Sequence, residues 1–466
     1  MRSLKPKAAA LLLIGAVAVA LPACKKKEGC TDPTASNYDP DAEKDCCCEY
    51  TTTPSDLVEV QGSITSNTTW TSDKKYLLKG FVYVEDGATL TIQAGTIIKG
   101  DKPTKGSLII KRGAKLIADG TASQPIVFTS NQSVGNRSRG DWGGIIICGR
   151  APHNQPSDPT VEGGPDAIYG GTNADDNSGI LRYVRIEFAG IAFQPNQEIN
   201  GLTLGAVGSG TTLEHIQVSY SGDDSYEWFG GNVNAKYLVA LAGLDDDFDQ
   251  DFGWQGHVQF ALSLRDPNGA DASGSNGFEC DNDAAGNSAA PYSQGTWSNV
   301  TILGPGTVSS TYSDLYKRGM HLRRNTKTRV YNSVFAGYPT GLLIDGSTTE
   351  TNATNNELQV RNCVLAGMTS NYAVASGSTW DCGGWFNTAG WGNMAYAANS
   401  DLGLTLPMSL TAPVLRPDAS SPLLTGAQFT GPLADSFYEQ VTFRGAFGAT
   451  DWTSGWTNWD PQNTTY

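Results

Sequence analysis

The chain has 466 residues, of which 39% are hydrophobic and 17% are charged, and its formal net charge is −15. This length permits a large buried core, and 54 glycines beside few long helical patterns argue against a helical enzyme and favour strands and turns. A strongly acidic chain is repelled by nucleic acid and by anionic lipid, so we expect no nucleic acid partner. Calcium, cationic ligands and neutral glycans suit this charge better.

Residues 1–23 have the layout of a lipoprotein signal peptide. Three basic residues precede an apolar run over residues 8–20, which is too short to span a bilayer comfortably, and "LPAC" then ends at Cys24. "LPAC" resembles the bacterial lipobox, in which the cysteine is lipidated and becomes the mature N-terminus, although Pro22 is a less usual occupant. The alternative is a plain signal peptide that happens to end in cysteine. Cleavage would remove three positive charges and change the net charge from −15 to −18.

The lipobox resemblance implies that the chain meets a membrane through an N-terminal lipid. Lys25 follows the lipidated Cys24, and a lysine there would not retain the protein at the inner membrane. We therefore expect an outer membrane lipoprotein at the cell surface, with the periplasmic face as the open alternative.

Residues 24–56 hold the lipidated cysteine, a linker and a module rich in Cys and Asp, "CTDPTASNYDPDAEKDCCCEY". Exported proteins can form disulfides, and the sequence leaves three possible partners for the first cysteine of the module. The disulfide candidates are Cys30, Cys46, Cys47 and Cys48. The stretch resembles a short cysteine-bounded module of bacterial exported proteins, which usually ends in a single cysteine.

The same module could hold calcium, because its side-chain oxygens fall at roughly alternate positions, as a calcium loop needs. The residues of this second possible metal site are Asp32, Asn37, Asp39, Asp41 and Asp45. The alternative is a solvated stalk that a disulfide holds together.

Residues 57–440 repeat themselves. "VEDGATLTIQAG" recurs after 26 residues as "IKRGAKLIADG", with Gly87 over Gly113 and Leu90 over Leu116. Later segments share a strand followed by a turn: "LRYVRIEFAG", "LEHIQVSYSG", "AKYLVALAG", "WSNVTILGPG", "RVYNSVFAG" and "VRNCVLAG". Short strands repeated at 20 to 30 residues cannot bury their apolar faces alone and must stack on copies of themselves. The sequence therefore predicts a parallel β-helix.

Two further features refine this prediction. Asn332 and Asn362 occupy equivalent positions thirty residues apart and could form an internal amide ladder. Segments 121–180 and 262–296 are rich in Gly, Asn, Asp and Ser, and they are expected as long loops on one face, where repeat proteins often bind ligands.

Residues 441–466 carry Trp452, Trp456 and Trp459 and no further coil pattern. Because a β-helix has open ends with unpaired strand edges, we interpret this segment as a C-terminal aromatic cap. An outward-facing platform for sugar rings would use the same tryptophans.

Several motifs carry a family resemblance: "DWGGIIICGRAP", "EINGLTLGAVGSGT", "SYSGDDSYEWFGGNVNAKYLV", "DDDFDQDFGWQGHVQF" and "SGSNGFECDND". Together they resemble a family of exported bacterial lipoproteins with a right-handed, pectate-lyase-like parallel β-helix, most of them without assigned function. The resemblance runs from about residue 57 to the C-terminus. It implies an all-β, single-stranded right-handed parallel β-helix, and it says almost nothing about activity.

Two acidic clusters lie in successive coils. At an offset of 22 residues, Asp223 pairs with Asp245, Asp224 with Asp246 and Glu227 with Asp249, while Ile216 pairs with Leu238 and Tyr226 with Phe248. Equivalent positions in neighbouring coils are about 4.8 Å apart. At an effective dielectric constant of about 20, two unit charges at that distance repel by roughly 3.5 kcal/mol. A bound cation, a proton on one carboxylate or splaying into water must relieve this repulsion.

Calcium is the cofactor that this acidic cluster favours, since calcium takes six to eight oxygen ligands. The predicted metal ligands are Asp223, Asp224, Glu227, Asp245, Asp246, Asp247, Asp249 and Asp251. A polar turn solvated by water is the plain alternative.

An enzymatic alternative uses the same cluster, because glycoside hydrolysis needs two carboxylates of different pKa. Its catalytic candidates are Asp223, Asp224, Asp245 and Asp246. "GDD" resembles part of a polygalacturonase active site, but the Gly-His-Gly and Arg-Ile-Lys segments of that family are absent from this sequence. The four histidines, His153, His215, His257 and His321, show no metal-binding spacing and are expected at the surface or in hydrogen bonds.

The basic segment 316–330, "YKRGMHLRRNTKTRV", could receive an acidic glycan, pair with the acidic face, or form a solvated face. The expected function is a calcium-stabilised β-helical binding or adhesion module for a glycan or surface polymer. A polysaccharide hydrolase or lyase and a structural envelope component are the alternatives, and the sequence favours the non-enzymatic interpretation.

Overall fold

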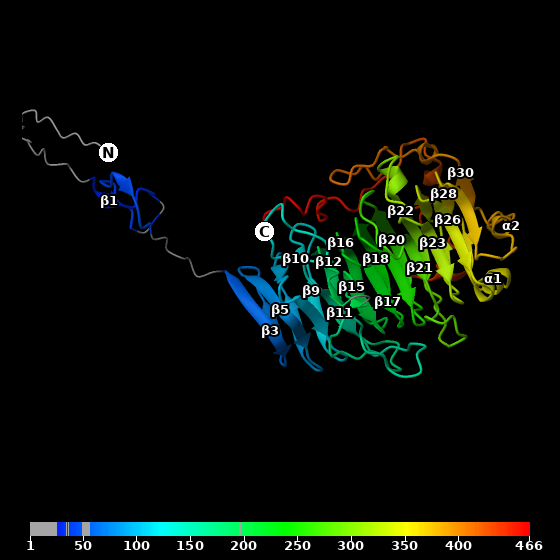
Figure 1. The fold of residues 1–466 in the computed structure, drawn as a ribbon. Coiled ribbons are helices and arrows are strands. Elements are labelled where there is room, and N and C mark those ends of the chain that lie inside the picture. The colour runs from blue at the N-terminus through cyan, green and yellow to red at the C-terminus, as the bar shows by residue number, and fades with distance from the viewer. Residues whose placement is uncertain (1–25, 34, 36, 49–55, 195–196) are drawn as a thin grey trace, which may run out of the picture. The chain divides into compact units, whose positions relative to one another are not determined.

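The structure is a computed structural model that describes residues 26–33, 35, 37–48, 56–194 and 197–466 (Figure 1). It divides into two compact units, Met1–Asp56 and Leu57–Tyr466. The predicted signal peptide and Cys24 lie outside the described residues. Within the described part, no helix is long and apolar enough to cross a membrane.

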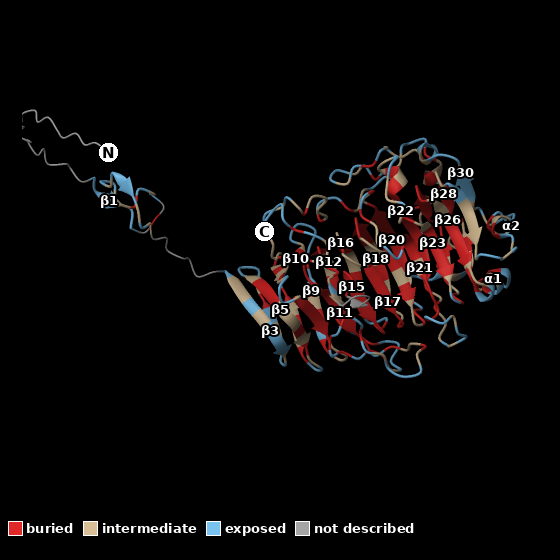
Figure 2. Ribbon diagram, in the orientation of Figure 1, coloured by how far each residue is buried: buried red, intermediate tan, exposed pale blue. Residues whose placement is uncertain are grey.

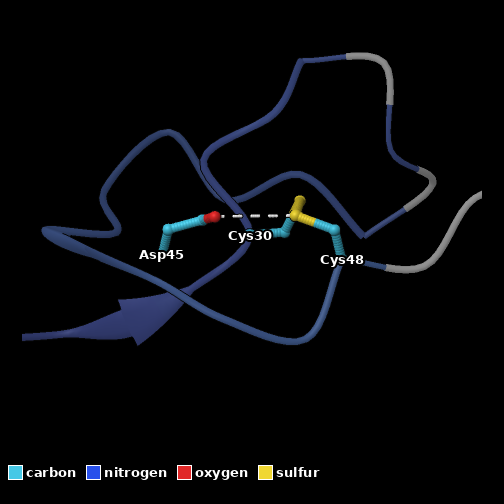
Figure 3. A group of neighbouring side chains, drawn as sticks. All are labelled: Cys30, Asp45 and Cys48. Carbon is cyan, nitrogen blue, oxygen red and sulfur yellow. Dashed lines mark hydrogen bonds between the residues drawn. A yellow bond between two sulfur atoms is a disulfide. The ribbon is translucent and has the colours of Figure 1, made fainter.

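The smaller unit contains one parallel strand pair, β1 (Glu28–Gly29) with β2 (Lys44–Asp45). A disulfide joins Cys30 to Cys48, which selects one of the three possible partners, and Figure 3 shows it beside Asp45. Cys46 and Cys47 are free thiols.

The larger unit is a parallel β-helix in which 26 strands form one hydrogen-bonded network. Each full coil supplies strands to three sheets. The first sheet contains β4 (Thr68–Trp70), β6 (Thr89–Ile92), β9 (Lys115–Asp119), β24 (Arg329–Tyr331) and β27 (Gln359–Arg361). The second contains β7 (Ile97–Gly100), β10 (Ile126–Ser130), β25 (Val334–Ala336), β28 (Val364–Ala366) and β30 (Met394–Tyr396).

Five long strands turn the corner between the first and second sheets: β12 (Gly179–Glu187), β16 (Thr212–Ser219), β18 (Ala235–Leu241), β20 (His257–Leu264) and β22 (Thr296–Leu303). At the N-terminal end, β3 (Leu57–Ile64) pairs with β5 (Lys75–Val84), with one register shift opposite Gly80 and Phe81. The third sheet contains β8 (Ser107–Ile110), β11 (Gly144–Cys148), β15 (Leu202–Gly205), β17 (Tyr226–Phe229), β19 (Phe248–Asp251), β21 (Asn276–Cys280), β23 (Arg318–Arg323), β26 (Thr340–Asp345) and β29 (Ser370–Val374).

The registers confirm the predicted repeats. Tyr226 lies opposite Phe248 in the next coil, and Leu90 lies opposite Leu116. Alternate side chains of the strands enter a continuous core of stacked apolar residues, which appears red in Figure 2. Stacking of identical coil positions thus buries apolar faces that no single coil could bury.

The corner between the first two sheets is a row of residues with left-handed backbone: Tyr183, His215, Tyr237, Phe260, Asn299, Asn332 and Asn362. Asn332 does not form the expected amide ladder with Asn362. Its side-chain nitrogen instead donates to Ser298 Oγ and to the carbonyl of Gln428, both at 3.1 Å. The left-handed corner turns the side chain outward, toward the C-terminal segment.

The C-terminal tryptophans cover this corner row and not an open end of the helix. Trp456 packs edge-on against Tyr183 and His215, and Trp452 packs against Tyr237 at a centroid distance of 5.3 Å. The stacked aromatic side chains of the corner row give these tryptophans an apolar surface to pack on, which explains the difference from the expected cap. Short 3-10 helices lie in the chain before residues 441–466: η1 (Pro305–Thr307), η2 (Asn399–Leu402), η3 (Pro422–Leu424) and η4 (Gly431–Ala434).

The last coil is covered by other residues. Helix α2 (Cys382–Phe386) contacts β29 and buries Phe386 in the main core. Helix α1 (Ser347–Thr354) contacts β26, and Trp385 donates to the carbonyl of Ala353 near its end. Helices α1 and α2 therefore cover the last coil, a role that the sequence analysis assigned to residues 441–466.

Segments 121–180 and 262–296 are only partly loops, because they also contain β10, β11 and β21. "IVFTS" and "GIIIC" are buried at every position, so they lack the alternation that would mark them as strands. The long connection after β11 folds over the outer face of the third sheet, where Val161 and Tyr169 pack on Ile109 and Ile146. The antiparallel pair of β13 (Ala192–Gln194) with β14 (Gln197–Glu198) follows further along the chain.

Candidate metal centre

One outward row of the third sheet changes from apolar to charged along the helix. Ile146 pairs with Thr203, and the same row continues through Glu227, Asp249, Glu279 and His321. The connection after β11 covers the apolar beginning of this row. The charged part therefore begins where that cover ends.

A second row of polar side chains lies in the turns that precede these strands, and it contains Asp224, Asp246 and Asn276. The backbone N–H of Asp246 donates to Asp224 Oδ1 at 2.7 Å, and the backbone N–H of Asn276 donates to Asp246 Oδ1 in the same way one coil later. This hydrogen bonding fixes the stacked carboxylates that the 22-residue offset predicted.

The two rows enclose a pocket of about 260 Å³. Its lining residues are Glu162, Asn200, Asp223, Asp224, Glu227, Asp245, Asp246, Asp249, Ser273, Gly274, Glu279, Arg318, His321 and Arg323. We call this the acidic pocket. Glu162 belongs to the connection after β11, so that connection forms one wall.

Three overlapping carboxylate triads lie in the acidic pocket, each with one oxygen per residue within 4.8 Å of the others. The triads are Asp223, Asp224 and Asp245; Asp224, Glu227 and Asp249; and Asp246, Asp249 and Glu279. Asp249 belongs to two of them, and its Oδ1 is sealed from solvent without a hydrogen-bond partner among the described residues. A buried oxygen without a donor is costly unless another group, such as a cation, contacts it.

The pocket carboxylates resist ionisation in the absence of a cation. Burial first, and then neighbouring carboxylates, raise the pKa of four of them well above the usual range: Asp224, Glu227, Asp246 and Asp249. Burial also raises the pKa of Asp245 to about 6. A divalent cation would reverse this effect, because it favours the ionised form.

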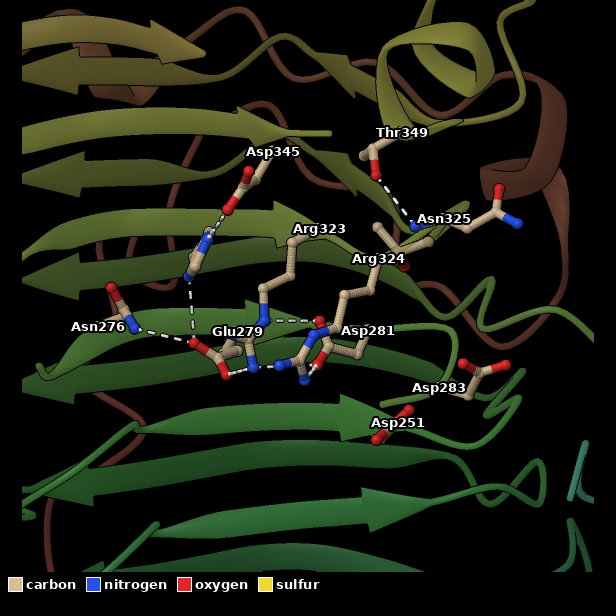
Figure 4. Close-up of polar contacts among 12 residues, drawn as sticks. Asp251, Asn276, Glu279, Asp281, Asp283, Arg323, Arg324, Asn325, Asp345 and Thr349 are labelled. Atoms are coloured by element: carbon tan, nitrogen blue, oxygen red, sulfur yellow. Dashed lines mark hydrogen bonds and ion pairs between the residues drawn. The ribbon is translucent and has the colours of Figure 1, made fainter. Parts of the chain in front are cut away.

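The opposite wall of the pocket is basic. His321 Nδ1 lies 3.1 Å from Glu279, and its Nε2 lies 3.0 Å from Asp345. Burial alone would raise the pKa of Glu279, but the hydrogen bond with His321 and the charge of Arg323 hold it below its usual value. Figure 4 shows Arg323 reaching both Glu279 and Asp281.

Six of the eight predicted ligands line the pocket, and Asp247 and Asp251 do not. Asp247 is fully buried and forms a 2.7 Å ion pair with Arg265. Asp251 lies at the far end of β19, and burial followed by the charge of Asp281 raises its pKa well above the usual range. Asp251 shares the outward face of β19 with Asp249 but lies two residues further along the strand, whereas Asp247 points inward from the turn. A compact acidic sequence therefore does not become one cluster.

Among the described residues of the cysteine-rich module, no three of the proposed carboxylates lie close enough together to share an ion. Asp39 accepts a hydrogen bond from Lys27, and Asp45 accepts one from Thr31. The described part of the module has one close group of potential ligands, Cys30, Asp45 and Cys48, but its two sulfurs are joined in the disulfide. Asn37 donates to the carbonyl of Cys47.

The site residues missed in the sequence are Glu162, Asn200 and Glu279, whereas Arg318, His321 and Arg323 belong to the basic segment 316–330. The motif "SGSNGFECDND" holds Glu279, and only knowledge of the coil register would have aligned it with Asp249. The basic segment does pair with the acidic face, since Arg324 also bonds Asp281 at 2.8 Å. His321, expected to be hydrogen-bonded, contacts two carboxylates at the pocket wall.

A larger pocket of about 650 Å³ lies elsewhere, beside the ends of β5 and β8. Five of its charged side chains form ion pairs: Arg150 with Asp86, Lys111 with Glu85, and Arg112 with Asp158 outside the pocket lining. Cross-coil ion pairs account for this pocket, so size alone does not make it the functional site.

The fold and the acidic pocket define the chain as a parallel β-helix protein with a carboxylate-lined site on one sheet. It belongs to the family described as the pectate-lyase like beta helix domain, whose model matches residues 62–398. No curated protein and no solved structure matches the chain.

Proposed function

We propose that the protein is a lipid-anchored β-helix of the outer membrane, displayed at the cell surface, that binds calcium in the acidic pocket and uses this site to bind a glycan or other surface polymer. The three overlapping carboxylate triads carry the proposal. The anchor and location rest on the "LPAC" sequence and Cys24.

Calcium suits the pocket on charge and on ligand type. Among the described residues, no Lys, Arg or His lies within ion-pair distance of Asp224, Glu227, Asp246 or Asp249. Hard oxygen ligands and high negative charge favour calcium over softer transition metals. The cation would neutralise carboxylates that are otherwise too close to be ionised together.

A bound calcium ion would also create the glycan site. Each triad contributes three residues, whereas calcium takes six to eight oxygens, so coordination positions remain for water or sugar hydroxyls. Arg318, His321 and Arg323 add hydrogen-bond donors on the neighbouring wall. A sugar with adjacent hydroxyl or carboxylate groups could contact the cation and this wall together.

A glycan array in calcium and in EDTA tests the proposal, with the purified protein and an Asp224→Asn, Asp246→Asn double variant. We expect binding that EDTA and the double substitution both abolish. Asp314→Asn, which changes an exposed aspartate outside the pocket, should bind as the wild type does. Glycan binding that persists in EDTA and in the double variant would show that the acidic pocket is not the binding site.

A specific observation favours polysaccharide cleavage as a second candidate function. Asp249 has a raised pKa and the adjacent Glu279 a lowered one, and an acid paired with an ionised carboxylate is the arrangement that glycosidases use. Incubation with a polysaccharide panel, with detection of new reducing ends and of unsaturated products, separates the two functions. An enzyme would lose turnover in Asp249→Asn and Glu279→Gln, whereas a binding module has no turnover to lose.

A further inference from the structure

Arg265 is a fully buried cation directly behind the acidic pocket. It follows β20 and is 0% exposed, and its guanidinium lies 5.0 Å from the ring centre of Tyr316. A buried guanidinium requires partners for its charge and its hydrogen atoms. The turn that carries two of the pocket carboxylates provides these partners.

Three contacts join Arg265 to this turn. Its Nη1 donates to Asp247 Oδ1 at 2.7 Å, and its Nη2 donates to the carbonyl oxygens of Asp245 at 2.6 Å and Leu244 at 3.2 Å. Ser263 donates to the other oxygen of Asp247. The planar guanidinium therefore fixes the inner side of residues 244–247 at several points.

The outer side of the same turn carries Asp245 and Asp246 into the acidic pocket. Rotation of the turn would move both carboxylates away from Asp224, which now accepts the backbone N–H of Asp246. When no cation is present, these carboxyl groups either hold protons or repel one another, and the repulsion of ionised carboxylates favours such a rotation. Arg265 opposes it through backbone contacts and through its own positive charge.

We propose that Arg265, together with Asp247, is the positioning residue of the calcium site: it holds the acidic turn in the ligand geometry without contacting the cation. This inference rests on the proposed calcium function and assigns Asp247 a role other than that of a ligand. Preorganised ligands increase affinity because less ordering occurs on binding.

The test replaces the ion pair by apolar side chains of similar size in an Arg265→Met, Asp247→Leu double variant. Such replacements often leave stability unchanged, so the fold should persist. In a calorimetric titration, we expect calcium affinity to fall at least tenfold although every pocket ligand remains. Hydrogen exchange in EDTA should show faster exchange of amides in residues 244–247, with the strands β18 and β20 unaffected.

Arg265→Lys keeps the charge but loses the planar fork, and it should show intermediate affinity. If the double variant does not fold, the Arg265→Lys variant tests the inference by itself. A calcium affinity of Arg265→Lys equal to that of the wild type would overturn the inference. A double variant that binds calcium as the wild type does overturns it as well. A wild-type protein that binds no calcium overturns the proposed function and this inference with it.

Discussion

Asp249 is the residue whose surroundings most favour the proposed calcium site. It belongs to two carboxylate triads, and its Oδ1 is buried without a hydrogen-bond partner among the described residues. Burial and the charge of Glu227 raise its pKa, so the ionised form is unfavourable in the protein without a cation. This placement is the one expected of a residue that contacts a cation.

Asp249→Asn should therefore have opposite effects with and without calcium. Loss of the like charge is expected to stabilise the calcium-free protein by about 1 kcal/mol, and loss of the ligand is expected to lower calcium affinity at least tenfold. Thermal unfolding in EDTA and in calcium measures both effects. Equal shifts of the melting temperature in the two conditions would rule out a ligand role, and Asp314→Asn serves as the control.

Asp245 makes stability depend on pH in the calcium-free protein. Burial raises its pKa from 3.8 to about 6, so the folded state binds this proton more tightly than the unfolded state does. The contribution of Asp245 to the free energy of unfolding is fully present below about pH 4 and is lost as the pH rises through about 6. Glu279 and Asp345 have lowered pKa values and act in the opposite sense, mainly below that window.

In EDTA, Asp245→Asn should gain stability relative to the wild type between about pH 4 and about pH 7, because asparagine does not ionise. Melting temperatures of both proteins across this range measure the difference. Parallel curves would mean that the carboxylate of Asp245 does not change its ionisation on folding.

Among the elements, the C-terminal segment is held to the β-helix by the left-handed corner row. Asn299 donates to the carbonyl of Phe443, and Gln217 exchanges two hydrogen bonds with the backbone of Asn458. Trp456 is 2% exposed and packs against Tyr183 and His215. These contacts make the segment part of the fold along one flank of the coils.

Trp456→Ala should destabilise the protein by roughly 3 kcal/mol, as expected for the loss of a buried aromatic side chain. Hydrogen exchange should become faster in residues 443–466, because the contacts of this segment depend on Trp456, while calcium affinity stays the same. Trp459→Ala, at a half-buried position, should have a smaller effect. An unchanged melting temperature in Trp456→Ala would show that the segment adds little to stability.

The sequence predicted the coils and half of the site because their spacing is regular. Glu227 and Asp249 are 22 residues apart in adjacent coils, so self-comparison places them together. Asn276 follows Asp246 after 30 residues and His321 follows Glu279 after 42, because loops of different length lie between them. Loop length has no effect on strand register but removes the period on which sequence comparison depends.

The direction of the side chains was the other property that the sequence did not predict. Asp246 and Asp247 are neighbours in sequence, yet the first enters the pocket and the second meets Arg265 inside the protein. The tryptophans at 452 and 456 were recognisable as a cover, but their contact surface, a row of aromatic corners, exists only after the coils have stacked.

For the whole molecule, a calcium ion that binds only the folded state should link the coils that meet at the acidic pocket. At a calcium concentration about one hundred times the dissociation constant, the gain in unfolding free energy is about 2.7 kcal/mol. Unfolding in calcium and in EDTA should show this gain in the wild type and in Asp314→Asn. No gain in the wild type at any calcium concentration would contradict a calcium-stabilised fold.

Calorimetric titration of the purified protein with calcium, beside the Asp224→Asn, Asp246→Asn double variant, is the direct test of calcium binding in the acidic pocket. We expect saturable binding by the wild type and its loss in the double variant, because the two substitutions remove ligands from all three triads. Absence of binding by the wild type, or equal binding by both proteins, would contradict the assignment of the acidic pocket as a calcium site.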